Sequence, residues 1–364
     1  MQSFVWTIPP HRLPDITREY RRYYLVTTMV DNLRAFLTEK KKPDYPIEKA
    51  LENWLIELAN SSGTEPDQVF RSRGPFPNLQ KVLIAKLGKS IAIPVVEMVT
   101  QTVATFFDDS TIIELPAITY DGQKLTFQSA QVDFPSEIYQ RLLLAHQQIS
   151  PKRGRDRTAD ILQLVLRYQS ILPYGDQWAV PRLCYEILSD FGFTHEAFAS
   201  PINSNFLQLN VNQGTPFSFG SLFYDIDRYF GSRGSFFDLK ATPGMRIVAN
   251  PVSTPELLSR TEEKIKELLA NPSVPVTIQF NAPGKLESYP IVSKLPSLRG
   301  HFVIPKGKFL YYFKDVPRVA QFDSLFAFFS TDPTFTDKDV TTIQSLFAST
   351  EGTIPDDVGT SIVI

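Results

Sequence analysis

The chain has 364 residues, 43% of them hydrophobic and 21% charged, and a formal net charge of −2. This composition excludes a wholly disordered protein, and the small net charge means that nucleic acid would be held by a local basic patch rather than by the field of the whole molecule. The single cysteine, Cys184, excludes an intramolecular disulfide, and the four histidines stand far apart, so no metal site is predicted.

No apolar run approaches the roughly 20 residues of a membrane-spanning helix. The N-terminal sequence MQSFVWTIPPHRLP lacks the basic, apolar and small-residue order of a signal peptide. We therefore expect an intracellular protein, nuclear or cytoplasmic, with no membrane partner.

Residues 1–150 predict a mainly helical module. Apolar residues recur at helical spacing from residue 15 to about residue 60, interrupted by the turn KKKPDYP, and again over residues 79–87 and 91–107. A small β-ribbon is expected around Asp121-Gly122, because this dipeptide tolerates the positive φ of a hairpin turn.

The segment SPKRGRDRT is the predicted boundary between this module and a second domain over residues 151–364. It is polar and turn-prone, and it contains Arg153 and Arg155 among four basic residues. Such runs are usually solvated linkers. The functional alternative is that Arg153 and Arg155 contact the phosphates of a nucleic acid.

The second domain alternates between helical and strand patterns. Helices are expected near residues 160–171 and 180–191, and strands at residues 196–200, 246–249 and 274–280. A helix over residues 255–270 has Thr254 as N-cap and Pro255 in its first turn. The resulting strand, loop, helix and strand favour a parallel crossover, so we predict an α/β fold.

The loop after the strand at 246–249 begins with Asn250 and Pro251. Ligands of open α/β sheets bind beyond the carboxyl ends of the strands. The Asn250 side-chain oxygen and the Pro251 carbonyl oxygen together suit the two protons of an exocyclic amine, and they would aim its lone pair at an electrophilic methyl group. The alternative is an ordinary β-turn, which Asn-Pro commonly opens.

Two segments upstream of Asn250 suit a ligand. FASPINSNF ends a predicted strand in short polar side chains, and RYFGSRGSFFD places Gly231 and Gly234 around a serine and an arginine. Glycines let the backbone approach a ligand closely, and successive amides can form an anion-binding nest. Glycine-serine loops are common, so the informative feature is the order of the segments.

Residues 160–280 carry LRYQSILPYG, FASPINSNF, YFGSRGSFFD and ANPVSTPELL in this order, and they resemble the methyltransferase core of the phosphorylated-CTD-interacting-factor family. The resemblance implies a class I Rossmann-like fold that uses S-adenosylmethionine. It also implies transfer of a methyl group to N6 of the cap-adjacent 2′-O-methyladenosine of messenger RNA. No WW-type module is visible in the sequence, so a partnership with the RNA polymerase tail is not predicted.

The resemblance also assigns roles to residues. Asn250 and Pro251 would hold the target amine, and Ser253, Arg153, Arg155 and Lys308 are the candidates for RNA contact. The segments around the methyl donor contribute Ser200, Pro201, Asn203, Gly231, Ser232 and Gly234. Lys308 stands in a basic and aromatic stretch that suits single-stranded RNA, and that equally suits an amphipathic strand pair.

The chain departs from the family where an Asn-Pro-Pro-aromatic tetrapeptide is expected, because Val252 and Ser253 follow Asn250-Pro251. Ser253 removes a ring that would stack on adenine, an interaction of roughly 1–3 kcal/mol. We therefore expect a large drop in rate unless Phe206, Phe236, Phe237 or a C-terminal tyrosine supplies a ring; the alternative for these aromatics is core packing.

Whether the chain is an active enzyme is left open by the sequence. One reading is an RNA adenosine N6-methyltransferase. Another is an inactive pseudo-methyltransferase that binds RNA, acts as a scaffold or activates a partner subunit. A third is a methyltransferase with a different substrate.

Overall fold

The computed structural model describes residues 5–6, 15–61, 76–108, 118–127, 130–149, 156–171, 178–213, 217–313 and 316–349. The chain divides into two compact units. Unit 1 comprises Met1–Pro9, Gln177–Tyr224 and Gly231–Ile364, and unit 2 comprises Pro10–Asp176 and Asp225–Phe230. The domain boundary near residue 150 stays a prediction.

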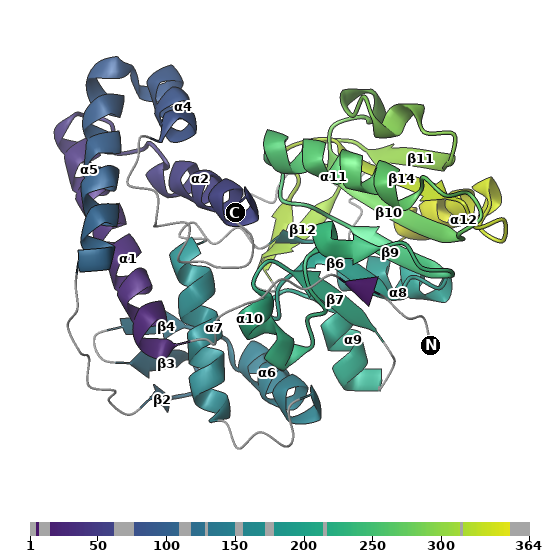
Figure 1. The fold of residues 1–364 in the computed structure, drawn as a ribbon, viewed down its shortest axis with the longest axis horizontal. Coiled ribbons are helices and arrows are strands. Elements are labelled where there is room, and N and C mark those ends of the chain that lie inside the picture. Colours follow the sequence, from purple (N-terminus) through teal and green to yellow (C-terminus); the bar gives the residue numbers. More distant parts are fainter. Residues whose placement is uncertain are drawn as a thin grey trace. The chain divides into compact units, whose positions relative to one another are not determined.

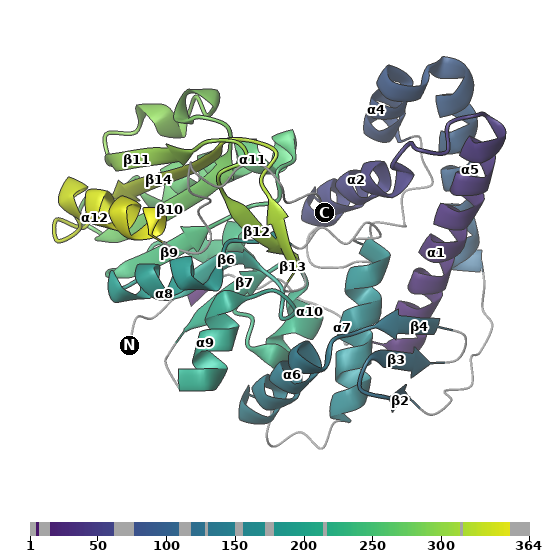
Figure 2. The same ribbon diagram turned by 180° about the vertical axis from the view of Figure 1, so that it is seen from behind.

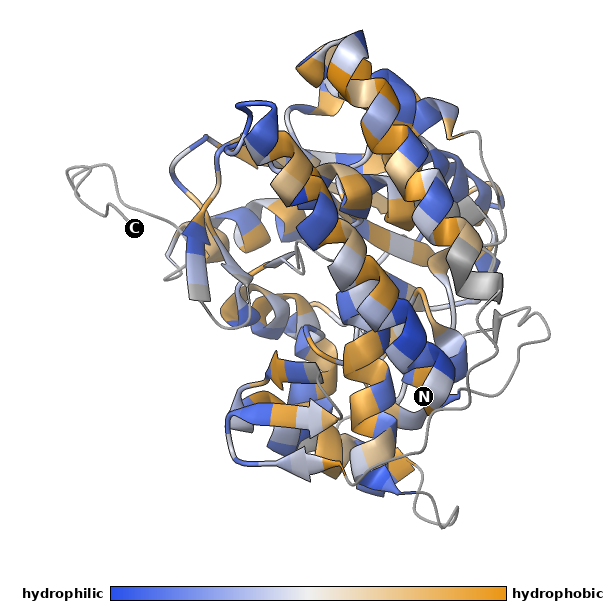
Figure 3. Cartoon of the chain, turned by 90° about the vertical axis from the view of Figure 1, so that its left-hand side faces the viewer, coloured by the Kyte–Doolittle hydropathy of each residue, from blue (hydrophilic) through white to orange (hydrophobic). Residues whose placement is uncertain are grey.

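Unit 2 is mainly helical (Figures 1 and 2). Its described helices are α1 (Ile16–Glu39), α2 (Ile47–Ser61), α4 (Pro77–Leu87), α5 (Lys89–Asp108), α6 (Ser136–Ile149) and α7 (Arg157–Ile171). Figure 3 shows hydrophobic and hydrophilic residues alternating along the helices, which is the pattern of amphipathic packing. An antiparallel sheet contains β2 (Thr119–Tyr120), β3 (Lys124–Phe127) and β4 (Ala130–Asp133), so the predicted helices and β-ribbon are confirmed.

A buried charge network lies in the interior of unit 2. On α7, Arg167 donates from Nε and Nη2 to the Glu19 carboxylate, at 2.7 and 2.5 Å, and from Nη1 and Nη2 to Asp225, at 3.1 and 2.9 Å. The next residue, Tyr168, donates its hydroxyl hydrogen to Asp227 at 2.7 Å. Two neighbouring residues of α7 therefore hold α1 and the segment Asp225–Phe230, which contains η1 (Arg228–Phe230).

The Arg167 guanidinium stays charged in this interior. Burial by itself lowers the pKa of Arg167, but the carboxylates of Glu19 and Asp225 raise that pKa well above its ordinary value. Each side chain of the Glu19–Arg167–Asp225 network is almost fully buried. The charges consequently depend on one another, because none of them is compensated by water.

Unit 1 contains a six-stranded sheet in the order β11-β14-β10-β9-β6-β7. The strands are β6 (His195–Ala199), β7 (Ser218–Ser221), β9 (Met245–Ala249), β10 (Val276–Pro283), β11 (Leu298–Ile304) and β14 (Ser324–Ser330). The neighbours β10, β9, β6 and β7 are parallel, whereas β14 is antiparallel to both β10 and β11. The predicted strands at 196–200, 246–249 and 274–280 are confirmed, and the mostly parallel sheet is consistent with a Rossmann-like α/β fold.

Two apolar clusters cover the faces of this sheet. On one face, which we call the α8 face, α8 (Arg182–Asp190), α9 (Asn205–Gln213) and α12 (Asp337–Ala348) contribute to a cluster with Val248, Phe326 and Phe328. On the other face, α11 (Pro255–Leu268) packs on alternate residues of the same strands, including Ile247 and Phe280. α11 begins as predicted, because the Thr254 hydroxyl accepts a hydrogen bond from the Leu257 amide at 3.3 Å.

Smaller elements complete unit 1. β5 (Trp178–Ala179), β12 (Leu310–Phe313) and β13 (Val316–Val319) form an antiparallel sheet in the order β13-β12-β5, and β1 (Val5–Trp6) pairs with β8 (Leu239–Lys240). The short helices are α10 (Tyr224–Asp227), which links the two units, η2 (Phe236–Asp238), η3 (Leu286–Ser288) and η4 (Val292–Lys294). In the described part of the chain, no helix is long and apolar enough to cross a membrane.

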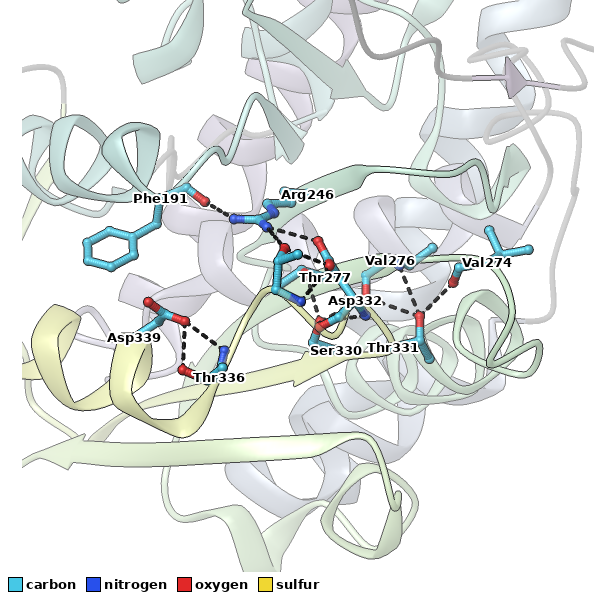
Figure 4. Close-up of polar contacts among 11 residues, drawn as sticks. Phe191, Arg246, Val274, Val276, Thr277, Ser330, Thr331, Asp332, Thr336 and Asp339 are labelled. Atoms are coloured by element: carbon cyan, nitrogen blue, oxygen red, sulfur yellow. Dashed lines mark hydrogen bonds and ion pairs between the residues drawn. The ribbon is translucent and has the colours of Figure 1, made fainter.

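At the amino end of β9, Arg246 joins three segments of unit 1 (Figure 4). Its Nη2 atom donates to Asp332 Oδ2 at 2.8 Å and to Thr334 Oγ1 at 2.9 Å, and its Nη1 atom donates to the Phe191 carbonyl at 2.5 Å. These contacts tie the end of α8 and the loop between β14 and α12 to the sheet. These Arg246 contacts lie at the amino end of β9, whereas ligands of α/β sheets bind beyond the carboxyl ends of the strands.

We expect Arg167→Met to destabilise unit 2 strongly, because the change leaves Asp225 buried without the cation that pairs with it and leaves Glu19 with Arg22 alone. Breaking a buried ion pair on one side costs about 3–5 kcal/mol. Urea denaturation followed by circular dichroism measures the effect. The control is Lys124→Met, whose side chain is 46% exposed and pairs with the exposed Asp133; there the loss is expected to stay below about 1 kcal/mol. Equal losses of unfolding free energy in the two variants would contradict the expectation that the buried charge network stabilises unit 2 more than an exposed ion pair does.

The lowered pKa of Asp332 predicts that the protein loses stability in acid. Burial raises its pKa, but hydrogen bonds from Thr334 and Arg246 outweigh burial and lower the pKa below its ordinary value. A lowered pKa stabilises the fold above the unfolded-state pKa of about 3.9, and this contribution disappears as the pH falls through the folded-state pKa. Unfolding of the wild type and of Asp332→Asn should therefore differ most near pH 6 and converge in strong acid. A difference independent of pH would refute this linkage.

Candidate functional site

The direction of the chain reverses between β6 and β9. From β6 the chain moves to β7 on one side, and it then returns to β9 on the other side of β6. Such a reversal is a topological switch point, where α/β sheets bind ligands beyond the carboxyl ends of their strands. Because β6 ends at Ala199 and β9 ends at Ala249, the residues that follow each strand emerge at one edge of the sheet, which we call the carboxyl edge.

A compact turn follows β6 at this edge. The Asn203 side-chain oxygen accepts hydrogen bonds from the Ser200 amide, at 2.7 Å, and from the Ser200 hydroxyl, at 2.9 Å. The Ser200 hydroxyl oxygen accepts in turn from the amides of Ile202 and Asn203, at 3.2 Å each. Ser200 and Asn203 therefore fix the shape of the turn around the buried Pro201, so they would act on a ligand mainly through backbone geometry.

Glu196 lies beneath this turn, and the sequence did not single it out. Its Oε2 atom accepts from the Ser204 hydroxyl at 2.8 Å and from the Phe206 amide at 3.4 Å. Burial raises the pKa of Glu196 to about 7, while hydrogen bonds from Tyr185, Ser204 and the first amides of α9 oppose that rise. Protonation of Glu196 therefore changes near neutral pH, directly below the turn that contains Ser200 and Asn203.

The predicted glycine loop runs alongside β7. Phe219 and Ser232 form a parallel bridge, the Arg233 amide donates to the Phe219 carbonyl at 2.9 Å, and the Ser221 amide donates to the Gly234 carbonyl at 3.0 Å. The loop therefore covers the outer edge of β7 and brings Gly234 level with Ser221, the last residue of that strand.

The two glycines of this loop have positive φ angles, 106° at Gly231 and 126° at Gly234, which other residues rarely adopt. Between them, the Ser232 hydroxyl lies 2.6 Å from the Ser221 hydroxyl and accepts from the Gly234 amide at 3.4 Å. The amides of Arg233 and Gly234 are thus already bonded within the protein, so the loop offers a ligand its carbon surface and small side chains.

Asn250, Pro251 and Ser253 lie in the five-residue loop between β9 and α11. Asn250 is half-buried, Pro251 is buried and Ser253 is exposed. Within the described residues, the Asn250 side chain makes no hydrogen bond, whereas Asn203 and Asn281 use theirs. Its amide is therefore free to bind an incoming group, and Ser253 contributes a hydroxyl where an aromatic ring was expected.

A further asparagine, Asn281, lies beside Asn250. Phe280 of β10 pairs with Ala249 of β9 in parallel register, so the next residues, Asn281 and Asn250, are level on adjacent strands. Asn281 is buried; its Nδ2 atom donates to the Leu325 carbonyl at 2.9 Å, and its oxygen accepts from the Tyr311 hydroxyl at 3.2 Å. In the sequence, Asn281 is one of three polar residues that alternate with apolar ones in VTIQFNAP, so no local signal distinguished it.

One basic candidate, Lys308, follows the end of β11, where Ile304 pairs with Ser324 and Ser324 pairs with Pro283 at the end of β10, so this turn leaves the sheet at the carboxyl edge. Arg153 and Arg155 lie outside the described residues. Lys308 lies in the turn between β11 and β12, where its amide donates to the Pro305 carbonyl at 3.0 Å. In the described ranges, no group of three or more His, Cys, Asp or Glu side chains is arranged to hold a metal ion.

Most of the aromatic candidates for the missing ring are core residues. Phe206 and Phe236 are fully buried, and Phe206 stacks on Phe217 with ring centroids 4.9 Å apart. Phe237 is partly buried, and the Arg260 guanidinium lies 4.3 Å from the centre of its ring. Phe206 and Phe236 therefore cannot stack on a base without unpacking the core.

The raised pKa of Glu196 predicts that Glu196→Gln changes the pH dependence of stability. A carboxyl group with a raised folded-state pKa contributes fully below its unfolded-state pKa, and this contribution is lost as the pH rises through about 7. The variant should therefore gain stability relative to the wild type between pH 5 and pH 8, on the order of 3 kcal/mol. Urea unfolding at both pH values measures the difference. A constant difference would show that Glu196 ionises normally.

The family comparison covers the whole carboxyl edge. A family model described as "Phosphorylated CTD interacting factor 1 WW domain" matches residues 136–313, just under half of the chain. The matched residues run from α6 to β12 and include the turn after β6, the glycine loop, Asn250 and Asn281. Over these residues, the chain is similar to the phosphorylated CTD interacting factor 1 family.

Proposed function

We propose that the chain is a class I, S-adenosylmethionine-dependent methyltransferase-like protein that acts on N6 of an adenosine in RNA. The observation that carries this proposal is the switch point between β6 and β9, which brings the turn at Ser200 and the loop at Asn250 to one edge of the sheet. Similarity to the family over residues 136–313 supports it. The family description, an interacting factor of a phosphorylated CTD, favours a nuclear protein with a protein partner as well as RNA.

The donor side of the site would be lined by backbone and small side chains. The turn from Ser200 to Asn203 is held by its own hydrogen bonds, and in the loop beside β7 the positive φ of Gly231 and Gly234 favours residues without a side chain at these two positions. These residues fit a bulky nucleoside ligand, because they allow the backbone to approach it closely. When bound, S-adenosylmethionine supplies an electrophilic methyl group.

The acceptor side would be formed by Asn250 and Pro251. The unbonded Asn250 amide oxygen and the Pro251 carbonyl oxygen can accept the two protons of an exocyclic amine. When both protons are held, the nitrogen lone pair points away from the loop. Because the amine is already aligned, the entropy cost of reaching the transition state is smaller. No side chain with an unusual pKa is required as a base, because the amine loses its proton readily after it has been methylated.

A pseudo-methyltransferase is the second candidate, and Ser253 favours it. That residue is exposed and carries no ring, and Phe206 and Phe236 are buried in the core. In this case the chain would bind RNA, serve as a scaffold or activate a partner subunit, with or without a bound donor.

The two candidates predict different outcomes in two measurements. Isothermal titration with S-adenosylmethionine is expected to show binding to the wild type and equal binding to Asn250→Ala, since Asn250 is assigned to the acceptor. Transfer of tritiated methyl to capped and uncapped RNA that begins with adenosine is expected to fall about 100-fold in Asn250→Ala, because alignment of the amine is lost. The control is Asn271→Ala, since Asn271 is exposed, lies before β10 and only accepts from the Ser273 amide, at 3.0 Å.

The outcomes separate the readings. Donor binding without transfer to either RNA would favour the pseudo-methyltransferase. No donor binding would exclude every enzymatic reading. Transfer that survives Asn250→Ala would remove Asn250 from the mechanism.

A further inference from the structure

The turns that follow β10 and β11 are bound to each other at the carboxyl edge. Asp323 directly precedes β14, and its backbone carbonyl accepts a hydrogen bond from the Gly284 amide at 2.6 Å. Its side-chain atom Oδ1 accepts from the Lys306 amide at 2.9 Å. Lys285, which follows Gly284, and Lys306 therefore lie on two turns that a single residue holds together.

The hairpin of β12 and β13 brings a further cation to the same edge. The Gly307 amide donates to the Ala320 carbonyl at 2.9 Å, so the turn after β11 is bonded to the residue that follows β13. Within the hairpin, Arg318 lies opposite Tyr311. The Tyr311 hydroxyl lies 3.3 Å from the hydroxyl of Ser324, the first residue of β14, and this contact fixes the hairpin at the carboxyl edge.

These segments carry more positive than negative charge. Residues 284–288, 305–308 and 318–323 contain four cations, which we call the basic rim, and two carboxylates: Lys285, Lys306, Lys308 and Arg318 against Glu287 and Asp323. Lys285, Lys306 and Arg318 are exposed, and none of these three forms an ion pair with a residue that the structure describes. Positive charge is therefore available to a ligand at the rim, although the whole chain has a formal net charge of −2.

The basic rim begins next to the acceptor loop and leads away from the donor side. Asn281 of β10 is level with Asn250, and Lys285 follows a few residues after Asn281. β14 and then β11 continue the sheet beyond β10, so the end of β11, from which Lys306 emerges, lies about 15 Å from the end of β9 at about 5 Å per strand. The turn at Ser200 and the glycine loop lie on the other side of β9, after β6 and beside β7. An acceptor nucleotide at Asn250 would have the donor on one side and the rim on the other.

We propose that the basic rim binds the phosphates next to the acceptor nucleotide of a single-stranded RNA. The proposal rests on the proposed function, and it adds the direction in which the RNA leaves Asn250, along the ends of β10, β14 and β11. Each phosphate carries a negative charge, and proteins that bind single strands hold the backbone in a positively charged groove. Such contacts position the strand without reading its sequence. The rim would therefore supply affinity, and Asn250 would recognise the exocyclic amine.

The test removes two charges from the rim of the full chain, by Lys285→Gln combined with Lys306→Gln. We call this double substitution the rim variant. Affinity for a labelled single-stranded RNA that begins with adenosine is measured by fluorescence anisotropy at several salt concentrations. RNA affinity should fall on the order of 10-fold at about 0.1 M salt, and the slope of log affinity against log salt should become shallower by about 1.4, since each contact contributes about 0.7. An unchanged slope would overturn the proposal.

The matched control is Lys266→Gln combined with Lys338→Gln, which removes the same charge from two exposed lysines at the opposite edge of the sheet. Lys266 is in the last turn of α11, which leads into the amino end of β10. Lys338 follows the end of β14 at that same edge, where Ser330 pairs with Thr277. RNA affinity and its salt slope should both remain those of the wild type. Equal losses in the control and in the rim variant would reveal a general effect of charge and overturn the proposal.

Methylphosphonate linkages, which carry no charge, locate the contact on the RNA. Placed next to the first adenosine, they should weaken binding to the wild type about as much as the rim variant does, and they should weaken binding to the rim variant little further. Equal weakening by the same number of neutral linkages at the far end of the strand would overturn the proposed location. A phosphoserine peptide tests a protein partner. Loss of peptide binding in the rim variant, with RNA affinity unchanged, would assign the rim to that partner and overturn the proposal.

Donor binding and methyl transfer separate this inference from the proposed function. Affinity for S-adenosylmethionine should be the same in the wild type and the rim variant. In methyl transfer, KM for RNA should rise on the order of 10-fold while kcat stays the same, because Asn250 is intact. Weakened RNA binding in the rim variant, with no donor binding in any variant, would support the rim and overturn the enzymatic function. Methyl transfer with an unchanged KM for RNA in the rim variant would overturn the rim alone.

Discussion

The parallel pairing of β6 with β9 is the constraint on which the candidate site depends. His195 lies opposite Ile247 and Glu196 lies opposite Val248, so the backbone hydrogen bonds of a few residues determine where both strands end. A slip of one residue would turn every side chain to the other face of the sheet, and the apolar clusters on both faces oppose that slip. The positions of Ser200 and Asn250 thus follow from strand register rather than from contacts between their side chains.

A second constraint comes from the buried charges of unit 2. Asp225–Phe230 belongs to unit 2, whereas the residues before and after it, including Ser221 and Gly231, belong to unit 1. The connection between the carboxyl end of β7 and the glycine loop therefore passes through the helical unit, where Arg167 and Tyr168 hold its two aspartates.

Local signals in the sequence were sufficient for much of unit 1. The cap at Thr254 and the apolar runs on either side of α11 predicted β9, α11 and β10, and the rule for strand ends selected Asn250. Strand order could not be obtained in this way, because it depends on pairings between distant residues. Asn281 was missed for that reason, since only the register of β10 against β9 makes it a neighbour of Asn250.

Burial was the other property that the sequence could not supply. Glu196 looked like an unremarkable residue at a strand end, yet the approach of Ser204 and α9 encloses it and raises its pKa to about 7. Phe206 is another example. The sequence allowed it as a stacking residue, but in the structure it is completely buried.

The proposed function makes two demands on the residues that follow β9: to accept the protons of an amine and to stack on a base. The first demand fixes the positions of the protein atoms much more strictly than the second. Accepting both protons of an amine requires oxygens at defined points, and the end of β9 provides these only through Asn250 and Pro251. Stacking requires a flat surface at the right height, and any element that reaches the carboxyl edge can present one. Under the proposed function, a ring missing at position 253 is therefore replaceable from another element, whereas the amide oxygen of Asn250 is not.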